Sequence, residues 1–178
     1  MIVPDLNLLL YAHNTGAKSH STAHHWWADL LQGDETVGIP WVVATGFIRL
    51  MSNPSLLEPP LLPSAGAEYI RHWFSHGHIS PLHPSDNHLA ILSRFLNIPG
   101  SGPNLVTDAH IAALALEHNA TVHTADSDFG RFPGLRWCNP LARIPRPVIH
   151  LTAPHDVRPL TTSRDNQRSV DGSVAFAG

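Results

Sequence analysis

Residues 2–12 read IVPDLNLLLYA, and this stretch decides the fold. Residues 2–4 are apolar and lead at once to the polar residues Asp5 and Asn7, which predicts a short buried strand followed by a turn. Residues 6–12 then look like the first turns of a helix. An aspartate directly after a buried strand is costly unless it has a partner. Asp5 is therefore the first candidate for a functional residue.

Outward from this stretch, helical and extended patterns alternate along the chain. Further helices are predicted at residues 19–31, 41–51, 64–74, 85–96 (with Ser85 as the N-cap) and from 107 or 108 to 118, and further strands at 36–39, 78–82, 120–123 and 135–138. Such alternation favours an α/β fold with a mainly parallel central sheet of four to five strands, covered by helices on both faces.

The alternating pattern ends well before the C-terminus. A chain of 178 residues has room for one domain with a sizeable core. After about residue 151 the sequence becomes rich in Thr, Ser, Pro, Asp and Arg without periodicity. We therefore predict one domain over residues 1–145 and a flexible C-terminal extension over residues 146–178.

Bulk composition limits the classes of function. The net charge of −3 argues against a general polyanion binder, so a nucleic-acid substrate would need a local patch or metal ions. Cys138 is the one cysteine, which excludes an internal disulfide and fits a reducing compartment. The apolar runs are too short to span a bilayer, and no signal peptide is visible. We expect a cytoplasmic protein without membrane association.

Four aspartates should gather at one edge of the predicted sheet. Asp5 follows the first strand, Asp126 and Asp128 follow the fourth, and Asp108 begins the helix that leads to it. Ligands of such sheets bind beyond the carboxyl ends of the strands. Taken singly, Asp108 could be an N-cap, and Asp126 and Asp128 could form hydrogen bonds with the backbone of their own loop. Their joint placement instead favours a site for Mg²⁺, which prefers carboxylate oxygens.

The same segments resemble a known family. The chain is similar to PIN-domain toxins of the VapC family in MIVPDLNLLLYA at residues 1–12, the 41–54 stretch, NLVTDAHIAALALEH at 104–118, TADSDF at 124–129 and FPGLRWCNPL at 132–141. Together these segments cover about residues 1–141. Because they occur in the family's order, the resemblance is specific.

The resemblance implies a three-layer α/β/α PIN-like domain that acts as an endoribonuclease, the toxin of a type II toxin–antitoxin system. It implies Mg²⁺, with Mn²⁺ as an alternative, and a metal-activated water that hydrolyses RNA. The expected partners are an RNA substrate, a small cognate antitoxin and a second copy in a homodimer. Asp5, Asp108 and Asp126 match the family's catalytic metal ligands, and Asp128 matches a less constant fourth.

One departure from the family pattern stands out. Many PIN domains carry a glutamate on the helix after the second strand, whereas residues 41–50 contain no acid and Gly46 stands at about that place. The number of bound metals therefore stays open. So does an alternative function, a non-catalytic PIN-like module that binds RNA or protein.

Histidines offer a competing metal site. His20 with His24, and His72 with His76, have the spacing that places two imidazoles on one helix face. Neither pair has an evident third ligand, so we expect them to be solvent-exposed. His110 should face away from the acidic site. Arg131 and Arg136 follow the acidic loop and are candidates for phosphate contacts or structural ion pairs.

Overall fold

The central sheet is parallel throughout. The computed structural model describes residues 1–100 and 102–142, so the predicted extension at 146–178 lies outside the described residues. The strands are β1 (Ile2–Pro4), β2 (Val37–Pro40), β3 (Ile79–Leu82), β4 (Thr121–His123) and β5 (Arg136–Cys138). They pair in the order β3-β2-β1-β4-β5. The predicted parallel sheet is confirmed, with all five strands present.

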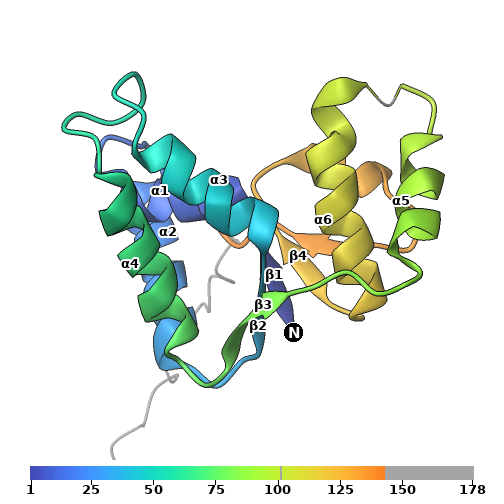
Figure 1. Ribbon diagram of the computed structural model, residues 1–178, viewed down its shortest axis with the longest axis horizontal. Helices are drawn as coiled ribbons and strands as arrows, with labels where there is room; N and C mark the ends of the chain where they lie inside the picture. The colour runs from blue at the N-terminus through green and yellow to red at the C-terminus, as the bar shows by residue number, and fades with distance from the viewer. Residues whose placement is uncertain (101, 143–178) are drawn as a thin grey trace, which may run out of the picture. The chain divides into compact units, whose positions relative to one another are not determined.

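Helices cover both faces of this sheet. They are α1 (Leu6–His13), α2 (His20–Gln32), α3 (Trp41–Met51), α4 (Pro63–Phe74), α5 (His88–Leu96) and α6 (Val106–Glu117), with short 3-10 turns η1 (Pro103–Leu105) and η2 (Ser127–Arg131). Helices α1 to α4 pack together on one side and α5 packs on α6 on the other, as Figure 1 shows. The predicted three-layer α/β/α architecture is therefore confirmed. No helix in the described part of the chain is long and apolar enough to cross a membrane.

Aromatic side chains fill the core on both sides of the sheet. Between the helices of the first layer, the rings of Phe47 and Trp73 lie 4.8 Å apart and those of Trp27 and Trp73 lie 5.1 Å apart. In the second layer, the ring of Phe95 lies 4.9 Å from that of Phe132. Strand β2 is buried along its whole length, as expected for a parallel strand covered on both faces.

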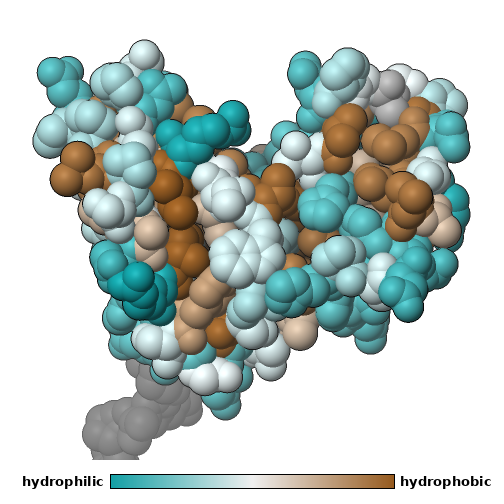
Figure 2. Space-filling view, viewed as in Figure 1, coloured by the Kyte–Doolittle hydropathy of each residue, from teal (hydrophilic) through white to brown (hydrophobic). Residues whose placement is uncertain are grey.

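An apolar hollow remains open on the surface between α3 and α4. It has a volume of about 520 Å³ and is lined mainly by Trp41, Ile48, Ile70 and Phe74. The brown patch beside α4 in Figure 2 follows this groove. Trp41 is 47% exposed, which is unusual for so large an apolar side chain.

Helix α5 begins later than predicted. Ser85 does not cap it, because its hydroxyl donates a hydrogen bond to Glu117 (2.8 Å) and accepts one from the Asn87 N–H (3.2 Å). The chain therefore makes a turn before α5 starts at His88. A short-range capping pattern in the sequence gave way to a contact with a residue on another helix.

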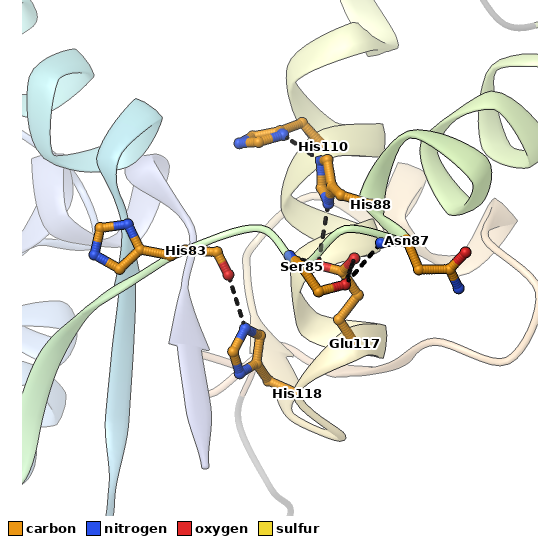
Figure 3. Close-up of polar contacts among 7 residues, drawn as sticks. All are labelled: His83, Ser85, Asn87, His88, His110, Glu117 and His118. Atoms are coloured by element: carbon orange, nitrogen blue, oxygen red, sulfur yellow. Dashed lines mark hydrogen bonds and ion pairs between the residues drawn. The ribbon is translucent and has the colours of Figure 1, made fainter.

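A polar network fastens α5 to α6 (Figure 3). His88 Nδ1 lies 3.1 Å from the Glu117 carboxylate, and His88 Nε2 lies 2.8 Å from His110 Nδ1. An ionised carboxylate can only accept, so His88 Nδ1 carries the proton. In neutral His88 the Nε2 atom then accepts from His110. His110 thus contacts His88 on α5, and Glu117 is the acceptor on which the network ends.

Replacing Glu117 by Ala is expected to lower the free energy of unfolding by about 1–3 kcal/mol, because the His88 N–H loses its acceptor in a largely buried place. The Glu117 side chain is only 5% exposed and that of His88 only 12%. The matched control is Glu68→Ala, which removes an ion pair with Arg71 from a side chain that is 62% exposed. That change should cost less than about 1 kcal/mol. Urea unfolding at neutral pH measures both, and equal effects would contradict a stabilising role for the network.

Candidate metal site

The strand order brings two loops together at one edge of the sheet. From β1 the chain moves outward through β2 and β3, whereas β4 lies on the opposite side of β1. The carboxyl ends of β1 and β4 therefore flank a topological switch point, the usual place of ligand sites in such sheets. A hydrogen bond of 2.9 Å from the Asp5 N–H to the His123 carbonyl ties the two ends together.

Asp5 is buried but well supplied with hydrogen bonds. It is only 6% exposed, and its Oδ1 accepts from the Leu6 N–H at 2.6 Å, which caps α1. Its Oδ2 accepts from Asn7 Nδ2 at 2.7 Å and from the Thr124 hydroxyl at 2.6 Å. Burial raises the pKa of Asp5 above 3.8 and outweighs these hydrogen bonds, while Asp126 raises it further. These contacts are the partners that a buried aspartate needs.

Thr124 is a site residue that the sequence alone did not indicate. Its side chain is fully buried, and its hydroxyl donates to Asp5 while accepting from the Asp126 N–H (2.9 Å) and from Asn7 Nδ2 (3.1 Å). One hydroxyl thus fixes the Asp5 carboxylate relative to the loop after β4. The available signal was a threonine between an apolar strand and Asp126.

Asp108 lies within electrostatic reach of the other aspartates. It lies in the first turn of α6, but the N-cap of that helix is Leu105, so the capping role considered for Asp108 is wrong. Burial, followed by the charges of Asp5, Asp126 and Asp128, raises the pKa of Asp108 to about 6. The other three carboxylates are therefore near enough to act on Asp108 electrostatically.

The loop after β4 uses part of its acidic content for its own structure. Asp126 Oδ1 accepts from the Asp128 N–H at 2.8 Å and caps η2. The loop-forming role considered for this residue is therefore real and occupies one of its two oxygens. Asp128 is exposed, so its carboxylate lies at the rim of the cluster.

The donor set suits a hard divalent cation. No three His, Cys, Asp or Glu side chains in residues 1–100 and 102–142 are grouped so that they could hold a metal ion together. Mg²⁺ commonly takes only one or two carboxylates and completes its shell with waters and substrate phosphate. A cation placed among these aspartates would also relieve the repulsion that raises the pKa of Asp108.

Helix α3 contributes no acidic residue to the cluster. The packing around Gly46 shows what surrounds the position where many PIN domains carry a glutamate. Gly46 is buried, and a Cβ built there would lie 2.7 Å from Leu6 Cδ2. Leu6 directly follows Asp5 in the chain. Position 46 therefore faces the start of α1 beside the cluster, and the leucine side chain occupies the space that a longer residue would need.

The other candidate residues have structural partners. Arg131 donates to the Pro99 carbonyl at 3.1 Å, and Arg136 donates to the backbone and side-chain oxygens of Asn119. Both arginines thus bind neutral oxygens of the fold. Of the histidine pairs, His24 and His72 are exposed as expected, whereas His20 and His76 are partly buried.

Comparison with known proteins identifies the family. Residues 2–135 match the model of the PIN domain family. "Ribonuclease VapC37" of Mycobacterium tuberculosis is 41% identical over 142 residues, which covers 80% of this chain and 99% of the relative. "Ribonuclease VapC33" of the same species is 38% identical over 141 residues, covering 79% and 99%.

Solved structures share the fold at lower identity. M. tuberculosis VapC20, described as a sarcin-ricin loop cleaving toxin, superposes with a TM-score of 0.56 at 18% identity over 73% of this chain and 93% of that one. The Rickettsia felis VapBC2 structure, bound to promoter DNA, gives 0.54 at 22% identity over 78% and 98%. Together with the 2–135 match and the two relatives, this places the chain in the PIN domain family, among the VapC ribonuclease toxins of type II toxin–antitoxin systems.

Proposed function

We propose that this protein is the toxin of a type II toxin–antitoxin pair and that it is a Mg²⁺-dependent endoribonuclease. The observation that carries the proposal is the cluster at the switch point, where burial and then the charges of Asp5, Asp126 and Asp128 raise the pKa of Asp108. Its relatives VapC33 and VapC37 are ribonucleases by name, which makes RNA the substrate class. The single cysteine supports a cytoplasmic site of action.

In this proposal Asp5, Asp108 and Asp126 are the metal-site carboxylates, with Asp128 as a fourth and Mn²⁺ as an alternative ion; the cation takes one or two of them directly and reaches the others through its waters. A bound divalent cation supplies charge stabilisation at the phosphate and lowers the pKa of an attacking water. The protein's part is to hold its carboxylates in place before substrate arrives. Asn7 and Thr124 do this for Asp5, because both donate hydrogen bonds to its Oδ2.

The proposed chemistry is hydrolysis of a phosphodiester by in-line attack of water, leaving a 5′-phosphate and a 3′-hydroxyl. His110, the histidine closest in sequence to Asp108, is hydrogen bonded to His88 on α5 and so is not poised as a general base. Products that end in a 2′,3′-cyclic phosphate would mean that the RNA's own hydroxyl attacks, and the water mechanism would then be wrong.

Asp5→Asn and Asp108→Asn are each expected to reduce RNA cleavage by at least about 100-fold, because the amide keeps the shape of the side chain but loses the charge that attracts the cation. The measurement is cleavage of a panel of structured RNAs by purified, antitoxin-free protein with Mg²⁺ and with EDTA. Asp34→Asn is the matched control, since Asp34 is exposed in the turn before β2, at the opposite end of the strands.

Wild-type activity in either variant at saturating Mg²⁺ would remove that residue from the site.

The alternative function, a PIN-like module that binds RNA or protein without cleaving it, is motivated by Gly46 on α3. It predicts RNA binding by the wild type with no cleavage under any metal condition. The same panel therefore separates the two functions.

Asp108→Asn is also expected to make the metal-free protein more stable at neutral pH. The pKa of Asp108 rises from 3.8 to about 6 on folding, first through burial and then through the other aspartates. The folded chain thus holds this proton more tightly than the unfolded chain does. Its contribution favours folding fully below about pH 3.8 and is lost as the pH rises through about 6.

Asparagine does not titrate, so the stability advantage of the variant should grow as the pH rises from about 4 to about 7. Urea unfolding of both proteins in EDTA across this range measures the difference. If the difference is the same at every pH, Asp108 does not have a raised pKa and the aspartates are not coupled.

An antitoxin partner follows from the family. The solved relatives include VapBC complexes from R. felis and from nontypeable Haemophilus influenzae. We propose that the small cognate antitoxin of this protein inserts an Arg or Lys side chain among the four aspartates, because an electronegative cluster attracts a cation. The exposed hollow between α3 and α4 is a suitable contact for a protein partner, including the second copy of the predicted homodimer (Figure 2).

Inhibition by the antitoxin is expected to weaken as Mg²⁺ rises, since the inserted side chain and the metal ion would occupy the same place. Titrating Mg²⁺ at constant ionic strength, with antitoxin held near its half-inhibitory concentration, measures the competition. Inhibition that stays unchanged over a wide range of Mg²⁺ would show that the antitoxin acts elsewhere on the surface.

A further inference from the structure

A polar pocket opens directly beside the aspartate cluster. It has a volume of about 380 Å³ and is lined by Asn7, Tyr11, Ala125, Asp126 and Ser127. This volume lies in the range of small-molecule sites, roughly 300–1,000 Å³. Asp126 belongs to the proposed metal site, so whatever occupies the pocket lies next to the reacting phosphate.

Asn7 forms the boundary between this pocket and the cluster. Its Nδ2 donates to Asp5 Oδ2, and its Oδ1 lies 3.4 Å from the Ala125 N–H. The amide is therefore held between the start of α1 and the loop after β4. Tyr11 is one helical turn further along α1, so both side chains project from the same face of the helix.

Tyr11 also borders a second pocket of different character. This pocket, of about 150 Å³, is lined by Tyr11, by Asn14, and by the apolar side chains Leu10, Ala17, Leu50, Met51, Leu56 and Leu57. Tyr11 is the residue common to the two linings. Outward from the cluster, the surface thus changes from polar side chains to an aromatic ring and then to aliphatic side chains.

The polar pocket and the adjoining Tyr11 ring match the chemistry of one nucleotide. Ribose and phosphate are polar and suit Asn7 and Ser127, whereas a base presents a flat π-face that stacks on an aromatic ring. We propose that Tyr11 binds the base of the RNA nucleotide next to the scissile phosphodiester, with its ribose in the polar pocket. The inference rests on RNA as the substrate proposed above, and it makes Tyr11 a substrate-positioning residue.

A purely structural role for Tyr11 is the competing explanation. The Tyr11 ring packs against the edge of the hydrophobic core. The backbone carbonyl of Tyr11 accepts a hydrogen bond from His20 Nδ1 at 3.0 Å. The carbonyl contact survives any side-chain change. Packing needs only apolar volume, which leucine supplies, whereas stacking on a base needs a ring. Tyr11→Leu and Tyr11→Phe therefore separate the two roles.

The test is a binding cycle that does not depend on cleavage. Wild type, Tyr11→Leu and Tyr11→Phe are titrated at low salt, with Ca²⁺ present to neutralise the carboxylates, against a short fluorescein-labelled single-stranded RNA and against an abasic RNA of equal length. We expect wild type and Tyr11→Phe to prefer the intact RNA, and Tyr11→Leu to lose roughly 5- to 150-fold of that preference. Tyr69→Leu is the matched control, since Tyr69 is on α4, 39% exposed, and lines a different pocket.

Three outcomes overturn the proposal: wild type that binds intact and abasic RNA equally or binds neither, an unchanged preference in Tyr11→Leu, or an equal loss in Tyr69→Leu. The first needs no variant, so it applies even if Tyr11→Leu folds poorly. Base-dependent binding without cleavage by any metal-loaded sample would sink the proposed hydrolysis and leave the nucleotide site standing. Cleavage without base-dependent binding would support the proposed hydrolysis and contradict the nucleotide site.

Discussion

The hydrogen bond from the buried Thr124 hydroxyl to Asp5 is the contact on which the proposed site depends. It joins the residue after β1 to the residue after β4 across the switch point, at 2.6 Å and out of contact with water. The same hydroxyl accepts from the Asp126 N–H, so the loop after β4 cannot move without disturbing Asp5. A parallel sheet brings strand ends together, but this bond sets the relative position of two carboxylates.

The negative charges of these carboxylates lower the stability of the folded chain. Asp5 is buried and Asp108 is half-buried, and burial raises the pKa of both; the charges of Asp5, Asp126 and Asp128 raise that of Asp108 further. A protein selected only for stability would replace one of them by a neutral residue, since a like charge nearby disfavours ionisation. The presence of four aspartates at one place is best explained by a ligand that carries positive charge. The polar network between α5 and α6 lies on the other face of α6 and helps to hold the helix that carries Asp108.

The sequence was sufficient for the parts of the fold that local patterns control. Apolar runs of three or four residues gave the strands, and helical periodicity gave the helices, because burial on a sheet or along one helix face imposes those periods. Ser85 was misjudged, since its partner Glu117 is far away in the chain. Asp108 resembled a cap from its position alone, yet η1 starts the helical path earlier and leaves its side chain free of that task.

The candidate site divides in the same way. Asp5, Asp108, Asp126 and Asp128 could be named from strand ends and from a family resemblance, because ligand sites lie at a predictable edge. Thr124 and Tyr11 could not, since their roles arise from contacts between α1 and the loop after β4. A threonine and a tyrosine in apolar surroundings look like core residues until the neighbouring loop is placed.

Electrostatics then limits how such a surface can hold RNA. The chain carries a net charge of −3, and the proposed reaction centre holds four of its fourteen acidic residues, so a phosphate backbone is repelled there. Arg131 and Arg136 bind the carbonyls of Pro99 and Asn119, where they support loops. In the proposed function, binding energy would therefore come from a cation among the aspartates and from contacts that do not depend on charge. In the proposed nucleotide site, the Tyr11 ring would supply the second kind, because stacking acts on the base and does not depend on the charge of the phosphate.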